Sequence, residues 1–166
     1  MNKRVEELVN LLIDNNLTIA TMESCTGGGL ANEITNVSGA SEVLRFSAVT
    51  YSNEFKVKMG VSAEVIDEFS VYSAQTAEEM SLNIAKFTNS DFGVGITGKL
   101  KRFDHANNAG ENDVVFVCVY STLDNQFYHK SIKVHHDTRE ENKQDVIGEV
   151  ARMITDLIME YSVNVK

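Results

Sequence analysis

The amino-acid sequence predicts an α/β fold: a three-layer α/β/α domain with a mixed, mainly parallel sheet. Strand-like and helical segments alternate from the N-terminus to residue 98, an order typical of parallel strands joined by helices. Two further strand-like segments, 113–121 and 126–134, follow each other across a four-residue connection, as in an antiparallel hairpin. A final helical segment after Asp137 closes the fold. We expect residues 1–166 to form a single domain, because this length is enough to bury one sizeable core.

The first half of the chain supplies the alternation. Apolar residues at helical spacing predict the first helix, which Asn15 and Asn16 end before a short apolar strand. Ser38 and Gly39 break the second helix, and Gly60 occupies a position that commonly ends a helix. In chain order, the expected elements are helix 5–12, strand 17–21, helix 30–35, strand 43–51 and two short helices, 54–59 and 63–69.

The second half begins with a clearer helix, which Ser73, Gln75 or Thr76 caps. Strand 91–98 follows, with glycines at points where another element approaches the backbone closely. The polar stretch 99–112 lacks periodicity and is expected to be a functional or a mobile loop. The apolar stripes expected to face the core are Ala77, Met80, Ile84 and Phe87 in this helix, and Val146, Val150, Met153, Ile154, Leu157, Ile158 and Tyr161 in the last helix.

The composition excludes several classes of function. The chain has 24 acidic and 15 basic residues, and its formal net charge of -9 argues against general binding to nucleic acids or anionic membranes. No apolar run reaches the roughly 18 residues of a membrane span, and the first ten residues lack the apolar core of a signal sequence, so we expect a cytoplasmic protein.

The cysteines and histidines predict neither a disulfide framework nor a metal centre. Cys118 lies in an apolar run typical of a buried strand, and two cysteines are too few for a framework in a chain of this length. The histidines show no recognised metal-ligand spacing, so no metal site is expected. They are His105, His129, His135 and His136, of which the last two are interpreted as an exposed pair at a strand end.

Residues 17–30 carry the candidate site. They run from an apolar strand through a polar tip that includes Ser24 into a glycine run and the start of a helix. Glycines let the backbone approach a bound group, and amides at a helix N-terminus favour an anion, either a phosphate or the oxyanion of an acyl-transfer intermediate. Ser24 is therefore a candidate nucleophile. The alternative is plain turn chemistry, in which serine and threonine cap the helix and glycine permits tight packing.

Cys25 is a second candidate nucleophile, because a cysteine at a helix N-terminus has a lowered pKa. A serine requires a base within hydrogen-bond reach and donors for the oxyanion. Ligand sites of open α/β sheets lie beyond the carboxyl ends of the strands. We therefore expect residues 23–29, residues 51–56 and the segment that begins at Thr97 to converge on one site.

Five short motifs then indicate a known family. They are ESCTGG at 23–28, GAS at 39–41, YSNEFK at 51–56 followed by Gly60 and Val61, VYSAQTAEEM at 71–80, and ITG at 96–98. In this order the sequence resembles the C-terminal domain of the CinA family over nearly its whole length. That domain also occurs alone as a nicotinamide mononucleotide deamidase. The resemblance implies a serine amidohydrolase without metal or cofactor, which converts nicotinamide mononucleotide to nicotinic acid mononucleotide and ammonia, and a homo-oligomer.

The resemblance also implies roles for individual residues. Ser24 attacks the carboxamide carbon, Lys56 acts as the general base and Tyr51 relays or orients the proton. A solvated surface position is the alternative for Lys56. For Arg139 the implied role is contact with the substrate phosphate, and an ordinary surface position is an equal alternative. The implied substrate-binding residues are Cys25, Thr26, Gly27 and Gly28 in the turn, Thr97 and Gly98 at the end of strand 91–98, and Arg139 at the start of the last helix.

One segment departs from the family pattern. The family has a glycine- and proline-rich loop after ITG, whereas this chain has bulkier residues over 99–110. Lys99, Lys101 and Arg102 are candidates to replace backbone amides as phosphate ligands. The first hypothesis is a working deamidase of a small-molecule nucleotide. The alternatives are a catalytically impaired paralogue that binds a nucleotide or a protein partner, and a hydrolase of another small amide.

Overall fold

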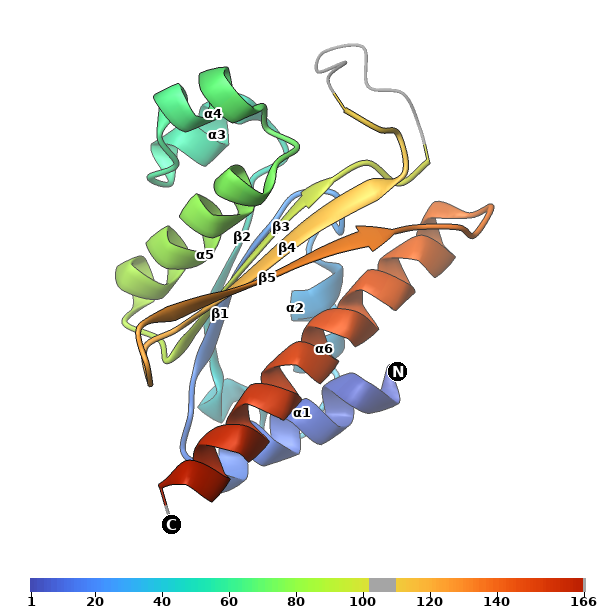
Figure 1. The fold of residues 1–166 in the computed structure, drawn as a ribbon. Coiled ribbons are helices and arrows are strands. Elements are labelled where there is room, and N and C mark those ends of the chain that lie inside the picture. Colours follow the sequence, from blue (N-terminus) through green and yellow to red (C-terminus); the bar gives the residue numbers. More distant parts are fainter. Residues whose placement is uncertain (102–109, 166) are drawn as a thin grey trace.

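A mixed sheet forms the centre of the structure (Figure 1). The computed structural model describes residues 1–101 and 110–165, and within them five strands lie in the order β2-β1-β3-β4-β5. β1 pairs in parallel with β2 and with β3, whereas β4 pairs antiparallel with β3 and with β5. Four of these strands therefore share one direction, which confirms the predicted mixed, mainly parallel sheet. The strands are β1 (Ile19–Glu23), β2 (Leu44–Val49), β3 (Phe92–Gly98), β4 (Val114–Ser121) and β5 (Gln126–Lys133).

Helices cover both faces of the sheet, as the three-layer prediction requires (Figure 1). One face carries α1 (Lys3–Asp14), α2 (Gly29–Thr35) and α6 (Arg139–Asn164), and the other carries α3 (Asn53–Lys58), α4 (Ala63–Phe69) and α5 (Ala74–Thr88). A short 3-10 turn, η1 (Ala40–Glu42), precedes β2.

Alternate residues of β1 enter two different cores. Ile19 packs into the larger core with α1, α2 and α6, whereas Ala20 and Met22 pack into a smaller core with Met80 and Ile84 of α5. Both faces of this strand are therefore buried, as expected for a central strand of a parallel sheet.

α1 and α6 fill the larger core with the stripes that their periodicity predicted. Most members of both stripes are buried or packed against buried residues. They are Val5, Leu8, Val9 and Leu12 in α1, and Val146, Val150, Met153, Ile154, Leu157 and Ile158 in α6.

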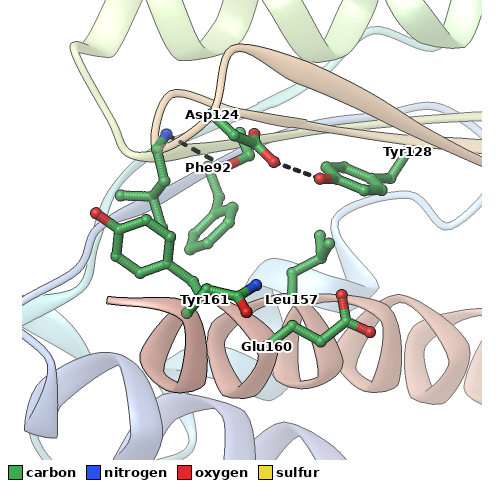
Figure 2. Close-up of a pocket in the computed structure, with 9 residues that line it drawn as sticks. Phe92, Asp124, Tyr128, Leu157, Glu160 and Tyr161 are labelled. Carbon is green, nitrogen blue, oxygen red and sulfur yellow. Dashed lines mark hydrogen bonds between the residues drawn. The ribbon is translucent and has the colours of Figure 1, made fainter. Parts of the chain in front are cut away.

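Tyr161 corrects the predicted stripe of α6, because 41% of its surface is exposed. It lies one turn beyond Ile158, the last fully buried residue of the helix. Figure 2 shows its ring at the rim of a surface pocket that Phe92 and Leu157 also line. Since Phe92 is the first residue of β3, this pocket lies at the amino end of that strand.

β3 and α5 pack unusually closely. A Cβ atom on Gly93 would lie 2.0 Å from the Ser81 carbonyl oxygen, and one on Gly95 would lie 2.2 Å from the carbonyl oxygen of Ala77. The glycines of β3 therefore mark a close approach, as predicted. Ser73 caps α5 by accepting a hydrogen bond from the Thr76 amide at 3.1 Å.

Phe87 corrects the predicted stripe of α5. Its side chain is 67% exposed, and its ring lies 5.4 Å from the ring of Phe46 on the edge strand β2. β2 is the edge strand, and among the described residues no further strand covers the end of α5 at this place. The aromatic pair packs on the surface instead of in the core.

The remaining boundaries differ little from expectation. β2 begins one residue later and ends two residues earlier than the predicted strand 43–51. β4 and β5 form the predicted hairpin, and Cys118 is buried in β4. Among the described residues, no helix is long and apolar enough to cross a membrane.

Candidate active site

The carboxyl ends of the three parallel strands are joined directly. The Ser24 amide donates a hydrogen bond to the Ile96 carbonyl oxygen at 2.9 Å, and the Thr50 amide donates to the Glu23 carbonyl oxygen at the same distance. These bonds bring the segments that follow β1 and β2 together beside the carboxyl end of β3. The expected convergence is confirmed for residues 23–29 and 51–56, whereas the segment that begins at Thr97 contacts other parts of the chain where it is described.

Lys56 contacts the candidate nucleophile. Its amine lies 3.1 Å from the Ser24 hydroxyl oxygen and also donates to the Thr50 carbonyl oxygen at 2.7 Å. Only 2% of Lys56 is exposed, so the alternative of a solvated lysine is wrong. The Ser52 hydroxyl caps α3 by accepting from the Phe55 amide at 3.3 Å. This cap begins the short helix that carries Lys56 beneath Ser24.

Burial makes the Lys56 amine available as a base near neutral pH. It lowers the pKa of Lys56 from the usual 10.5 to about 8, because the charged ammonium loses water of solvation. Among the described residues, no carboxylate forms an ion pair with Lys56 that would restore the charged form. A neutral amine at 3.1 Å can accept the proton of the Ser24 hydroxyl.

Cys25 has the opposite character. Burial raises the pKa of its thiol to about 12, against the smaller lowering effects of the Arg139 and Lys56 charges. The thiol therefore stays protonated near neutral pH, whereas a cysteine nucleophile acts as the thiolate. The tip of the turn favours Ser24 over Cys25 as the nucleophile.

The glycine turn after Ser24 offers backbone donors. Gly27 and Gly28 have φ angles of 62° and 87°, which glycine adopts without strain. The Gly27 amide donates to the Ser24 carbonyl oxygen at 2.9 Å and is not available to a ligand. Within residues 1–101 and 110–165, the amides of Thr26 and Gly28 have no acceptor. They are the candidate oxyanion donors.

Glu23 organises the other side of this turn. Its buried carboxylate accepts hydrogen bonds from the Leu30 amide at 2.9 Å and from the Ala31 amide at 3.0 Å, both in the first turn of α2. The Thr26 hydroxyl donates to the same carboxylate at 2.7 Å. The carboxylate thus fixes the start of α2 and the turn that carries Ser24. Sequence reasoning assigned Glu23 no role, and its only signal was a place at the end of an apolar strand.

Thr50 is a second residue that sequence reasoning missed. Thr50 directly follows β2 and lies beside Ser24, which directly follows β1, since Glu23 and Val49 are the last partners in the strand register. The Thr50 side chain is buried, and its hydroxyl oxygen is the one buried side-chain polar atom without a hydrogen-bond partner among the described residues. Such an orphaned group beside Ser24 is a candidate contact for a ligand.

Tyr51 and Arg139 contact each other rather than Ser24 and Lys56. An Arg139 guanidinium nitrogen lies 3.4 Å from the Tyr51 hydroxyl oxygen, to which it donates. Tyr51 is 65% exposed, and among the described residues no hydrogen bond joins it to the serine or the lysine. The electrostatic effect of Arg139 on Cys25 nevertheless places its charge at the turn. The structure therefore groups both residues at the outer edge of the site.

Lys143 lies at the same edge and was not singled out from the sequence. Its amine nitrogen is 3.5 Å from the place that a Cβ atom on Gly27 would occupy. Lys143 follows Arg139 by one turn of α6, so both cations lie on one face of the helix. The four-residue spacing of Arg139 and Lys143 is visible in the sequence. It indicates a shared site only once the packing of α6 against the glycine turn is known.

The predicted contacts from β3 and the following loop have other partners in the structure. The Thr97 hydroxyl donates to the Val71 carbonyl oxygen at 2.9 Å. A Cβ atom on Gly98 would lie 2.5 Å from the backbone of β4, which explains the glycine by close packing. The Lys99 amine lies 4.8 Å from the centre of the Tyr72 ring, and Lys101 pairs with an aspartate at 3.5 Å. Arg102 and the rest of the altered stretch through residue 109 lie outside the described residues.

The fold and the site together describe an α/β domain that carries a serine–lysine pair. The pair lies at the carboxyl edge of the mixed sheet, and its lysine is buried. The chain belongs to the CinA family, since the family model described as the CinA C-terminal domain matches residues 1–158. The resemblance noted in the sequence is confirmed.

Relatives with known sequences extend this assignment. A CinA-like protein of Kosmotoga olearia is 49% identical over 94 residues, which make up 56% of this chain and 23% of that protein. A protein of Clostridium novyi described as competence-damage inducible is 48% identical over 94 residues, with the same coverage. The match thus spans about a quarter of the length of these curated relatives.

Solved structures agree in fold. A CinA superfamily protein from Klebsiella pneumoniae 700603 superposes with a TM-score of 0.88 at 20% identity, covering 96% of this chain and 98% of that one. The competence/damage inducible protein CihA from Agrobacterium tumefaciens gives a TM-score of 0.80 at 27% identity, covering 93% and 95%. The α/β architecture is therefore that of the CinA superfamily.

Proposed function

We propose that the chain is a serine amidohydrolase that deamidates nicotinamide mononucleotide to nicotinic acid mononucleotide and ammonia. The observation that carries the proposal is the 3.1 Å contact between the Lys56 amine and the Ser24 hydroxyl, with the amine shielded from water. Burial leaves this lysine with a pKa of about 8, in the range that a general base needs near neutral pH. Membership of the CinA family supports this choice of substrate, because the resemblance is to deamidases of nicotinamide mononucleotide that consist of this domain.

The chemistry follows from the two side chains. The neutral Lys56 amine takes the hydroxyl proton as Ser24 Oγ attacks the carboxamide carbon, and the amides of Thr26 and Gly28 hold the oxyanion. When the carbon–nitrogen bond breaks, the Lys56 ammonium returns its proton to the departing ammonia. Water then attacks the acyl-enzyme and gives a proton to Lys56. Lys56 returns this proton to Ser24 Oγ as the ester bond breaks and the acid product leaves.

The cations at the edge of the site suit the phosphate of this substrate. Arg139 and Lys143 lie one helical turn apart beside the glycine turn. On a chain with a net charge of -9, an anionic ligand requires such a local concentration of positive charge. We assign these two residues to the phosphate group and the Ser24–Lys56 pair to the carboxamide.

The proposal is tested by incubating the purified chain with nicotinamide mononucleotide and measuring ammonia and nicotinic acid mononucleotide together. The matched substrate is nicotinamide riboside, which has the same carboxamide but no phosphate. We expect equal amounts of the two products from the mononucleotide and slower turnover of the riboside. Binding of the mononucleotide in a calorimeter without any product would instead support the impaired paralogue, and would refute the amidohydrolase.

A further inference from the structure

A cluster of metal-ligating side chains lies where β5 leads into α6. His135 and His136 follow β5, and Asp145 is on α6. One donor atom from each of these residues lies within 4.8 Å of the other two. We propose that this cluster binds a divalent transition-metal ion of the zinc or nickel class, at a place separate from the Ser24–Lys56 pair.

Two of the donors are in direct contact and need to separate only slightly to reach coordination spacing. The His136 Nε2 atom lies 2.8 Å from an Asp145 carboxylate oxygen. Bonds of about 2.0–2.1 Å from zinc to nitrogen and oxygen place neighbouring ligand atoms about 3.3 Å apart in a tetrahedron. The centres of the His135 and His136 rings lie 4.4 Å apart, and the donor nitrogen of His135 lies within 4.8 Å of the other two donors. The His135 side chain is exposed, so solvent leaves it room to change rotamer.

The backbone that carries the histidines is held in place. Asn142, which is 1% exposed, accepts a hydrogen bond from the His136 amide at 2.9 Å. Its side-chain amide donates to the His136 carbonyl oxygen at 3.1 Å. This double contact fixes His136 against α6 before any ion binds. Metal sites need ligands oriented by such supporting contacts.

Among the described residues, Asp145 pairs with a histidine and with no lysine or arginine. Two cations that line the same surface pocket as His135 and Asp145 are paired with other carboxylates: Arg4 with Glu149 at 3.0 Å and Lys133 with Asp113 at 3.6 Å. Within the part of the chain that the structure describes, His136 is the ion-pair partner of Asp145.

The donor set selects the class of ion. Two imidazoles and one carboxylate suit zinc, nickel or copper, whereas magnesium and calcium prefer oxygen ligands alone. Three protein ligands leave at least one coordination position to water. Binding would link the connection after β5 to the amino-terminal part of α6.

The sequence did not reveal this site. His135 and His136 were expected to be an exposed strand-end pair, and Asp145 lies nine residues beyond His136 in the chain. Only the return of α6 along the sheet brings the carboxylate to the histidines. The proposal does not depend on the deamidase function, because none of its ligands contacts Ser24 or Lys56 among the described residues.

The test is calorimetric titration of the chain with zinc chloride, repeated with nickel and with magnesium. We expect one zinc or nickel ion per chain and no saturable binding of magnesium. His136→Gln and Asp145→Asn should each weaken zinc binding by at least about tenfold. The matched control is His129→Gln, which removes a histidine that pairs with Glu78 at 2.7 Å on another face of the sheet.

The control variant should bind zinc as the unaltered chain does. A melting temperature measured in chelator, equal for all variants, verifies that each is folded. The proposal is overturned if the unaltered chain shows no saturable zinc binding. It is also overturned if His136→Gln and Asp145→Asn both bind zinc normally, or if His129→Gln alone abolishes binding.

Discussion

The Lys56 amine lies 3.1 Å from the Ser24 hydroxyl, although 32 positions separate the two residues in the chain. Ser24 follows the interior strand β1, and Lys56 belongs to the short helix after the edge strand β2. The parallel pairing of these strands brings both segments to the same edge of the sheet. The fold thus buries an amine beside a hydroxyl that is otherwise inert near neutral pH.

Replacing Lys56 with methionine, which keeps a long unbranched side chain, should lower kcat for deamidation by about 10²–10⁴-fold, the usual contribution of a general base. In the unaltered chain, kcat/KM should rise with pH and reach half of its maximum near pH 8. The reason is that the neutral amine accepts the proton and burial has lowered its pKa to about 8. A rate that is independent of pH between 6 and 9 would contradict this role.

The same lowered pKa predicts a pH dependence of stability. Lys56 releases its proton near pH 8 in the folded chain but near 10.5 when unfolded, so the unfolded state binds more protons between these values. The free energy of unfolding should therefore increase from about pH 8 to 10.5, relative to that of Lys56→Met. Urea unfolding of both proteins across this range measures the difference. Parallel curves would show that the folded environment leaves the amine unperturbed.

The close packing of β3 against α5 predicts a large effect of one added methyl group. Gly93→Ala should destabilise the chain by at least about 2 kcal/mol, because its Cβ atom would lie 2.0 Å from a carbonyl oxygen of α5. Gly148→Ala is the matched control within α6, where the nearest atom to the new Cβ is the end of the Asn2 side chain at 3.3 Å. It should leave stability unchanged or raise it by up to about 1 kcal/mol. Thermal or urea unfolding decides, and equal effects of the two substitutions would refute the packing argument.

Arg139→Gln and Lys143→Gln should each raise KM for nicotinamide mononucleotide by about tenfold or more, since a hydrogen bond to a charged group is lost. Both should leave KM for nicotinamide riboside nearly unchanged, because the riboside has no phosphate. Arg152→Gln removes an exposed cation farther along α6 and serves as the control. Equal losses with both substrates would place Arg139 and Lys143 away from the phosphate.

The alternation of elements and the apolar stripes were enough to predict the sheet, its helical layers and the place of Ser24. The burial of Lys56 was not predictable from the pattern, because Lys58 in the same short helix has similar neighbours in sequence yet is exposed and pairs with Glu54. Phe87 was wrongly predicted to be buried for a related reason. Helical periodicity shows which side of α5 faces the sheet, but it does not show where along the helix the sheet ends. Such long-range relations are fixed by packing.

The most direct test of the serine mechanism compares two neighbours. Ser24→Ala and Cys25→Ala each remove one side-chain heteroatom from the same turn. The measurement is the initial rate of ammonia release from nicotinamide mononucleotide, with the fold of each variant verified by its melting temperature. We predict that Ser24→Ala releases no ammonia above background, whereas Cys25→Ala retains turnover. Activity that survives in Ser24→Ala but disappears in Cys25→Ala would contradict the account.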